Sequence, residues 1–480
     1  MRLFRSRKQK KADSETKRRV LFVSHEATRT GAPKIILNIL KHFHANCDIS
    51  CETILHSGGF LASEFEQHGV VDCMNLAREP GEELVKRVTK FVQREKGNLP
   101  VMAVCNSMES RFVAQALASH GIPLISLVHE LPSSYTHEDY TTVFDASQRI
   151  VFPVHAVREA TEAFTDVPYG KGLVLSQGLL NSSFGTGVGR DEAQQRIRKE
   201  LGLPENAFVV LGCGTLDLRK GIDHYVNIAR ETVTQNNSHT PIHFVWVGEG
   251  PRWTHSPYHY VQLDLQNSPA RGYVHFIGER EDVEPYFMGS DAFLLTSRVD
   301  PFPCVIHEAM ASSLPVITFS DSGGAPEAVG NGSGFVVPYG DYGHAGNVIR
   351  MLAAQPEIAS GMRQKSFERV HTRYRFDDYA DKLIDVCESI LGYELRRPIA
   401  PGSATATTYP PTIPMHSPQQ VAPIQNAPSP SPQAPIQVPA QAQMMPHTPV
   451  VNHQVAQQHQ PHQVSAQPHM YPDQQQQRAA

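Results

Sequence analysis

The sequence lacks the patterns of a membrane-spanning or secreted protein. No run of 18 or more apolar residues occurs in its 480 residues, and the N-terminus has no apolar stretch of the kind found in signal peptides. The seven cysteines include no C-x-x-C pair, so we expect buried free thiols rather than a disulfide framework. These absences predict a cytoplasmic protein.

Charge is scarce at one end of the chain and one-sided at the other. Residues 401–480 hold only two charged side chains, Asp473 and Arg478, together with 16 of the 36 prolines and 17 glutamines. Such a composition cannot bury a core, so we predict a disordered Pro/Gln/His-rich tail over 397–480. The first 19 residues hold nine Lys or Arg against two acids, a formal charge of +7, and predict a flexible basic arm over 1–18.

The body between these ends is acidic. Because the whole chain has a formal charge of −5, removing the arm's +7 leaves −12 on residues 20–400. An acidic body does not suit the phosphates of nucleic acids, and we expect no nucleic-acid partner. The arm has two open interpretations: contact with anionic lipid at the inner face of a membrane, or a solubilising extension.

Short apolar runs alternate with amphipathic segments, which is typical of a parallel sheet with helices on both faces. In the first half we expect strands at 20–24, 49–55, 101–105, 124–129, 150–153 and 173–176. After a polar stretch at 181–189 the alternation resumes, with strands expected at 208–213, 242–247, 274–277, 292–296, 316–319 and 334–337. Residues 342–397 are expected to be helical throughout.

The predicted fold is therefore α/β, with two Rossmann-like doubly wound domains that face each other across a cleft. We place an N-terminal domain at 19–178, a C-terminal domain at 179–375, and a helix at 376–396 that packs back on the N-terminal domain. Ligands of such sheets bind at the carboxyl ends of the strands, so we expect the ligand in the cleft.

Several motifs of known chemistry are missing. Neither G-x-G-x-x-G nor the P-loop pattern occurs, which argues against a dinucleotide site or a P-loop nucleotide site. The chain also has no D-x-D triplet, no G-x-S-x-G elbow, and no His or Cys spacing of a closed metal site. We expect neither a metal nor a cofactor.

Two adjacent cations, Arg219 and Lys220, follow the strand expected at 208–213 and precede a helix. Cations at the carboxyl end of a strand, beside a helix start, suit a diphosphate. A solvated basic pair at a surface turn explains the same residues, and the pair alone does not decide between them.

Two carboxylates, Asp300 and Glu308, bracket a predicted strand-to-helix turn with the sequence DPFPCVIHE. Both can reach one small ligand placed above the helix start. The ordinary alternatives are an Asp-Pro turn residue and an exposed helix acid. Against the second, the neighbours of Glu308 on its helix face are Cys304, Ala311 and Ser312, which are small and uncharged.

Glycines precede two further helix starts. Gly31 stands shortly before Pro33, where we expect the helix to begin, and Gly323-Gly324 precedes a second helix. Free N–H groups there suit phosphate or sugar hydroxyls, and a tight turn without a ligand is the equal alternative. His129 ends a strand of the first domain and is expected to point into the cleft.

Together these elements resemble glycosyltransferase family 4, the retaining, metal-independent sugar transferases of the GT-B fold. The resemblance covers about residues 19–395, and the pair Asp300 and Glu308 matches the family's E-x7-E element. Its other parts are Gly214-Thr215, Arg219-Lys220-Gly221, Phe244-Val245-Trp246-Val247-Gly248 and Ser322-Gly323-Gly324-Ala325-Pro326-Glu327.

The resemblance implies a nucleoside diphosphate sugar as donor and a glycan, lipid-linked or protein acceptor in the first domain. It implies that His129, Asp300 and Lys220 are the catalytic residues. It also implies a donor-binding set, in which Arg219 and Lys220 bind the diphosphate and Glu308 the ribose, Asp300 with the backbone of Phe302, Pro303 and Cys304 binds the sugar, and Gly31 lets a loop close over the phosphates.

Two positions depart from the family pattern. Asp300 stands where many relatives have Glu, which shortens the reach of the carboxylate by one methylene. Thr215 replaces a common Arg, which removes one diphosphate cation that Arg219 is placed to supply. Alternative functions on the same fold are a sugar-nucleotide epimerase, a glycan phosphorylase, and a non-catalytic sugar-nucleotide-binding scaffold that uses the Pro/Gln-rich tail.

Overall fold

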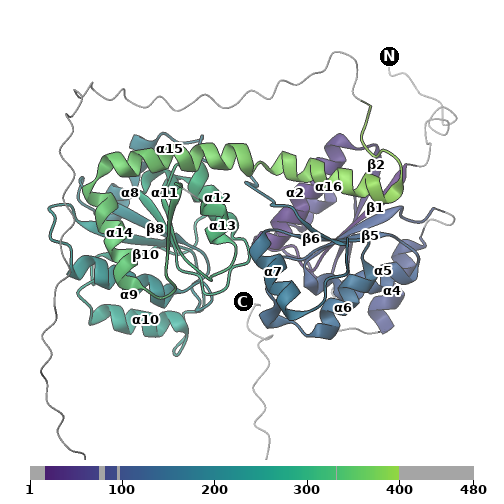
Figure 1. The fold of residues 1–480 in the computed structure, drawn as a ribbon, viewed down its shortest axis with the longest axis horizontal. Coiled ribbons are helices and arrows are strands. Elements are labelled where there is room, and N and C mark those ends of the chain that lie inside the picture. Colours follow the sequence, from purple (N-terminus) through teal and green to yellow (C-terminus); the bar gives the residue numbers. More distant parts are fainter. Residues whose placement is uncertain (1–16, 75–81, 95–97, 331, 399–480) are drawn as a thin grey trace, which may run out of the picture. The chain divides into compact units, whose positions relative to one another are not determined.

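The computed structural model describes residues 17–74, 82–94, 98–330 and 332–398, which form two parallel sheets covered by helices (Figure 1). The strand orders are β3-β2-β1-β4-β5-β6-β7 and β10-β9-β8-β11-β12-β13. In each sheet the chain starts on a central strand, proceeds to one edge, and returns to build the other side. The prediction of two doubly wound α/β sheets is confirmed, whereas residues 1–16 of the basic arm and residues 399–480 of the tail lie outside the described residues.

The strands agree closely with the apolar runs of the sequence. The first sheet contains β1 (Arg18–Ser24), β2 (Ile49–Leu55), β3 (Val70–Cys73), β4 (Met102–Asn106), β5 (Leu124–Leu127), β6 (Arg149–Phe152) and β7 (Gly172–Val174). The second contains β8 (Phe208–Cys213), β9 (Ile242–Val247), β10 (Val274–Phe276), β11 (Ala292–Leu295), β12 (Val316–Phe319) and β13 (Gly334–Val337). The central strands are buried on both faces, as continuous apolar runs require.

Helices connect the strands and cover the sheets. In the first half these are α2 (Gly31–Asn46), α3 (Ala62–Glu66), α4 (Glu82–Val92), α5 (Arg111–Ser119), α6 (His137–Ala146) and α7 (His155–Phe164), with 3-10 turns at Met108–Ser110 and Pro132–Ser134. In the second half they are α8 (Arg190–Leu201), α9 (Ile222–Thr234), α10 (Pro257–Gln266), α11 (Glu284–Gly289), α12 (Cys304–Ala311), α13 (Ala325–Val329), α14 (Tyr342–Ala354), α15 (Pro356–Arg373) and α16 (Phe376–Leu391).

Strand β3 is absent from the sequence-based prediction. It is four residues long, lies at the edge of the first sheet, and has no fully buried residue. Without a fully apolar run or a clear alternation, such an edge strand resembles a loop in sequence.

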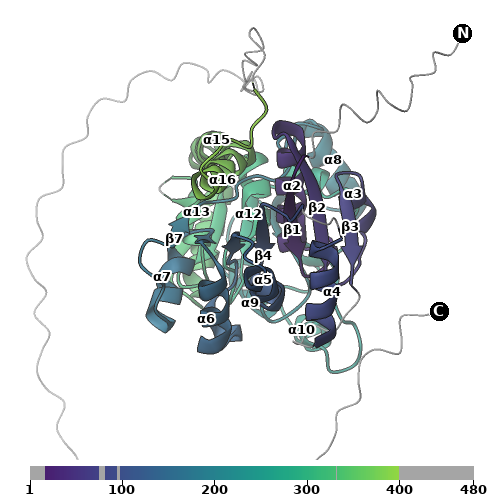
Figure 2. The ribbon, with the colours of Figure 1, turned by 90° about the vertical axis from the view of Figure 1, so that its right-hand side faces the viewer.

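Helix α16 returns to the first half of the chain and packs on α2, which itself lies against β1 and β2 (Figures 1 and 2). Its buried side chains, Phe376, Tyr379, Ala380, Leu383, Ile384 and Cys387, join the hydrophobic cluster of α2. Backbone hydrogen bonds from Asp48 to Leu395 and from Arg397 to Asn46 continue this packing beyond the helix. The domain boundaries themselves stay a prediction.

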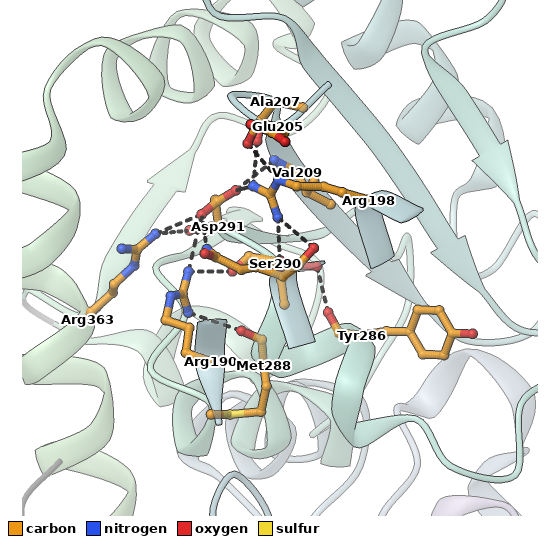
Figure 3. A network of polar contacts seen from close by, with 12 residues as sticks. Arg190, Arg198, Glu205, Ala207, Val209, Tyr286, Met288, Ser290, Asp291 and Arg363 are labelled. Carbon is orange, nitrogen blue, oxygen red and sulfur yellow. Dashed lines mark hydrogen bonds and ion pairs between the residues drawn. The ribbon is translucent and has the colours of Figure 1, made fainter. Parts of the chain in front are cut away.

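A polar network at the start of β11 fixes α8 and α15 to the second sheet (Figure 3). The carboxylate of Asp291 accepts hydrogen bonds from the guanidinium groups of Arg190, Arg198 and Arg363 at 3.2, 3.3 and 3.2 Å. It also accepts from the backbone N–H of Val209 at 2.9 Å. Most of the remaining guanidinium donors bind backbone carbonyls, so this buried charge holds the amino-terminal edge of the sheet together.

None of the helices in the described part of the chain combines the length and the apolar character needed to cross a bilayer.

Candidate functional site

The lysine of the adjacent basic pair contacts the first carboxylate of the motif. The ammonium of Lys220, in the loop after β8, lies 2.5 Å from Oδ2 of Asp300, in the loop after β11. Strands β8 and β11 are the neighbours at which the strand order of the second sheet reverses. Ligands of doubly wound sheets bind outside the carboxyl ends of the strands at such a reversal.

The loop that carries Lys220 is shaped by a glycine and an aspartate. Asp217 accepts hydrogen bonds from the hydroxyl of Thr215 at 2.8 Å and from the backbone N–H of Lys220 at 2.7 Å. Gly221 has φ 73°, and a Cβ at this position would lie 2.0 Å from the carbonyl oxygen of Thr296. Only glycine fits this close approach, and it directs the lysine toward the reversal point.

Asp300 is fixed by both its side chain and its backbone. Its side chain is 9% exposed, and Oδ2 accepts a second hydrogen bond from the hydroxyl of Ser297 at 3.1 Å. Its backbone N–H donates to the carbonyl of Ser322 at 2.9 Å, and its carbonyl accepts from the N–H of Gly324 at 3.3 Å. The intervening Gly323 has φ 122° and no room for a Cβ, so the glycine-rich turn lies directly against the Asp300 loop.

Glu308 lies in the second turn of α12. Among the described residues, no side chain or backbone group forms a hydrogen bond or ion pair with its carboxylate. Burial raises the pKa of Glu308, and the charge of Lys34 lowers it in part. A half-buried carboxylate without a protein partner is costly unless water or a ligand supplies hydrogen-bond donors.

The charges of these residues affect the pKa values of two cysteine thiols, Cys304 and Cys213. Burial raises the pKa of Cys304 to about 12, with smaller contributions from Glu308 and Asp300, while Lys34 and Lys220 act in the opposite direction. Cys213, at the end of β8, has a pKa raised to about 12 by burial and by Glu308. Both thiols therefore lie within the electrostatic reach of the same lysines and the same glutamate.

The expectation of buried thiols is partly wrong. Cys47, Cys51, Cys105 and Cys387 are buried, but Cys73, Cys213 and Cys304 are partly exposed. Cys73 belongs to the edge strand, whereas Cys213 and Cys304 lie at the ends of elements that border the site. Apolar surroundings in the sequence do not distinguish a strand centre from a strand end.

Gly31, in the first half of the chain, lies next to Cys304 at this site. A Cβ at Gly31 would lie 3.5 Å from Sγ of Cys304, an ordinary contact distance. Helix α2 begins at Gly31 itself, so Pro33 is the third helical residue and its predicted place at the first position is wrong. Proline fits anywhere in the first turn, because the N–H groups there have no partner within the helix.

His129 lies near the start of α2, fixed by Asn106 at the end of β4. The amide of Asn106 donates to the carbonyl of Ala32 at 3.0 Å, so its oxygen accepts from Nε2 of His129 at 2.9 Å. Burial and the charge of His25 lower the pKa of His129 to about 4. The imidazole is therefore neutral at pH 7, with an unprotonated Nδ1 that has no partner among the described residues.

Glu130 holds the backbone beside His129. Its carboxylate accepts a hydrogen bond from the hydroxyl of Ser107 and another from the N–H of Met108 at 3.1 Å. It also accepts from the N–H of His129 at 3.0 Å. Burial raises the pKa of Glu130, and these donors partly offset that effect.

The remaining predicted site residues, Arg219, Phe302 and Pro303, differ in their exposure and in the groups that they could offer to a ligand. Arg219 is exposed, and its guanidinium donates to the carbonyl of Val299 at 3.4 Å, one residue before Asp300. The side chain of Phe302 is buried in the hydrophobic core. Pro303 precedes the first residue of α12 and supplies no N–H.

Sequence reasoning missed four residues that shape the site: Asn106, Asp217, Ser297 and Lys34. The first three follow or end a strand at the carboxyl edge of a sheet, so their position relative to the strands was the available signal. The sequence does not single out Lys34, because a lysine on a helix surface is ordinary. Its relation to the site becomes visible only when the position of α12 is known. In the part of the chain that the structure describes, no three His, Cys, Asp or Glu side chains gather as a metal site would require.

The fold is GT-B. Anabaena HepE, solved in complex with UDP and glucose, superimposes with a TM-score of 0.65 and 18% identity, over 77% of this chain and 99% of that protein. A likeness at this level of identity establishes the fold of the described sheets and their order.

Residues 207–354 match the family model described as Glycosyl transferases group 1, which confirms the resemblance inferred from the motifs. The chain is 32% identical over 124 residues to alpha-galactosylglucosyldiacylglycerol synthase of Streptococcus pneumoniae. It is 27% identical over 203 residues to N-acetyl-alpha-D-glucosaminyl L-malate synthase of Bacillus anthracis. These alignments cover 25% and 42% of this chain and span 31% and 49% of the two relatives.

Proposed function

We propose that the protein is a retaining, metal-independent glycosyltransferase that moves a sugar from a nucleoside diphosphate sugar to a glycan, lipid-linked or protein acceptor. The family match falls on the half that carries Lys220, Asp300 and Glu308. The structurally similar HepE binds UDP and glucose. Both observations support a nucleotide-sugar donor.

One observation carries the proposal: Lys220 contacts Asp300 at the reversal point of the second sheet, while Glu308 nearby has no partner among the described residues. An ion pair between Lys220 and Asp300 that served only to stabilise the fold would not require the second carboxylate of Glu308 close by. An unpaired, half-buried carboxylate suits the vicinal hydroxyls of a ribose, which donate two hydrogen bonds to its two oxygens. The neighbouring ammonium suits the diphosphate attached to that ribose.

The same arrangement explains how the bond to the leaving group breaks. Cleavage of the sugar–phosphate bond places negative charge on the diphosphate and positive charge on the anomeric carbon. Lys220 would stabilise the diphosphate, together with the more exposed Arg219. The free backbone N–H groups of Cys304 and Val305, at the start of α12, would assist them. These fixed groups would supply the positive charge that other transferases take from a metal ion.

Asp300 and His129 would position the sugar. One oxygen of Asp300 already accepts from Lys220 and Ser297, which leaves the other to accept a sugar hydroxyl. The neutral His129 presents Nδ1 as an acceptor for a second hydroxyl, because its Nε2–H is held by Asn106. A neutral imidazole is preferable here, since a positive charge would oppose the developing charge on the sugar.

The test of this proposal is a panel of nucleoside diphosphate sugars, screened by thermal shift and then by product analysis. A true donor at about 100 times its Kd stabilises the folded chain by about 2.7 kcal/mol. We expect release of the nucleoside diphosphate, a new glycoside with the anomeric configuration of the donor, and full activity in EDTA. Epimerised donor without transfer, or binding without turnover of any acceptor, would contradict the proposal.

A further inference from the structure

A cation and an aromatic ring form a small exposed shelf on the first half of the chain. The guanidinium carbon of Arg29 lies 3.5 Å from the ring centroid of Phe60, and Phe60 is 69% exposed. Arg29 is exposed as well, and among the described residues no carboxylate or carbonyl contacts its guanidinium. The ring therefore occupies one flat face of the guanidinium, and the N–H groups have no acceptor among the described residues.

The two loops that carry the shelf are joined by backbone hydrogen bonds along their length. In the loop after β2, the backbone N–H of His56 donates to the carbonyl of Ser24 at 3.0 Å, and the backbone N–H of Ser57 donates to the carbonyl of His25 at 3.1 Å. Leu61 donates to the carbonyl of Ala27 at 2.8 Å. Hydrogen bonds of this kind on both sides of Phe60 fix the backbone of the loops from which the Phe60 and Arg29 side chains extend.

A close approach between these loops also constrains their backbone. Gly59 has φ 159°, and a Cβ there would lie 2.4 Å from the carbonyl oxygen of Ala27. Only a residue without a side chain allows this approach. The hydroxyls of Thr28 and Thr30 further fix the loop by bonding to the carboxylate of Glu26, at 2.6 and 3.4 Å.

Folding stability does not account for this shelf. An exposed cation–π pair contributes roughly 0.5–1 kcal/mol, and a phenylalanine left mostly in water gains little from burial. An arginine preorganised on a ring, however, loses little further entropy when it binds an anion through two parallel N–H groups. The pair also lies at the carboxyl edge of the first sheet, two residues before Gly31, which reaches Cys304 of the proposed donor site.

We propose that Arg29 and Phe60 bind the acceptor, and that this acceptor carries an anionic group, phosphate or carboxylate, beside a sugar or other flat apolar surface. The inference rests on the proposed transferase function. The guanidinium edge binds the anion, and the open part of the Phe60 ring packs on the adjacent C–H surface.

The experiment uses the full chain with its donor site saturated by the nucleoside diphosphate that the thermal-shift panel selects. Three probes that share a ring are then titrated by ligand-observed NMR: phenyl phosphate, benzoate and the neutral phenyl β-glucoside. The variants are Arg29→Gln and Phe60→Ala. The matched control is Arg18→Gln, since Arg18 also stacks on an exposed ring, Tyr393, at 4.1 Å, but at the opposite edge of the sheet.

We expect at least one anionic probe to bind the wild type more tightly than the neutral one, with affinity reduced tenfold or more in Arg29→Gln and unchanged in Arg18→Gln. Preference between phosphate and carboxylate then identifies the source of the charge. Equal binding by wild type and Arg29→Gln, or binding of all three probes alike, overturns the inference. Absence of nucleoside diphosphate binding in every variant would instead contradict the transferase function, so the two failures are distinguishable.

Discussion

The Nζ atom of Lys220 lies 2.5 Å from Oδ2 of Asp300, and the two residues come from loops that follow the neighbouring strands β8 and β11. Both side chains are mostly buried, at 14% and 9% exposure. The ion pair joins the basic pair and the carboxylate motif, which are 80 residues apart in the chain. In the proposed function, this ion pair lies where the diphosphate and the sugar of the donor would bind.

Replacing Lys220 by Ala should reduce transfer by roughly 100- to 1000-fold, because the variant lacks one fixed charge that stabilises the leaving group. The change also leaves Asp300 without its cation, and an unpaired buried carboxylate destabilises the fold. The double variant Lys220→Ala/Asp300→Ala removes that charge and should recover the melting temperature but not the activity. Steady-state kinetics and thermal melts measure both effects, and wild-type turnover in Lys220→Ala would refute the assignment.

Glu308→Gln should stabilise the protein at neutral pH while weakening the donor. The folded chain holds the proton of Glu308 more tightly than the unfolded chain, because burial raises its pKa above the ordinary 4.5. Stability contributed by protonation is therefore present at low pH and is lost as pH rises through the raised pKa. The melting temperature of Glu308→Gln should exceed that of the wild type at pH 7, and the difference should shrink toward pH 4. An equal or lower value at pH 7 would rule this out.

His129 should make the folded chain sensitive to acid. Its pKa is about 4 in the folded state against 6.5 ordinarily, so between these values the unfolded chain binds more protons. Stability then falls as pH decreases from 6.5 to 4, by about 3 kcal/mol for this group. Melts of wild type and His129→Gln across this range isolate the contribution, because the other buried histidines are common to both. Parallel pH profiles would show that His129 is not held neutral.

Much of the fold can be predicted from the sequence, because strands that are buried on both faces appear as continuous apolar runs. Strands β8, β9 and β12 have the bounds that continuous apolar runs predict, because nearly all of their residues are buried. Strand β3 is not predicted, since this four-residue edge strand is interrupted by Asp72 and has no fully buried residue. Helix α2 begins two residues before Pro33, because a proline is tolerated anywhere in a first turn and does not fix its start.

The site is predictable only where its residues are adjacent in the chain. Asp300, Glu308 and Lys220 lie in short segments whose spacing is visible without a structure. Asn106 and Lys34 acquire meaning only when the carboxyl edge of the first sheet and the start of α12 are brought together, which no local pattern encodes.

The carboxylate of Asp291 should be a stability determinant without a part in donor binding. Asp291→Ala leaves three arginines around a missing partner, and breaking a buried pair destabilises by about 3–5 kcal/mol. Asp223→Ala is the matched control, because it breaks the more exposed pair with Arg298 and should change stability by less than about 1 kcal/mol. Denaturant unfolding compares the two variants. Equal stability of both, or weaker donor binding by folded Asp291→Ala, would contradict this division.

The most direct measurement is calorimetric titration of the full chain with the selected nucleoside diphosphate, for wild type, Lys220→Ala and Glu308→Gln. If these residues form the donor site, the wild type binds one equivalent and each variant binds at least tenfold more weakly. The reasons differ, because Glu308→Gln holds the ribose hydroxyls less firmly whereas Lys220→Ala has no ammonium for the diphosphate. Equal affinity in all three proteins would show that the nucleotide binds elsewhere.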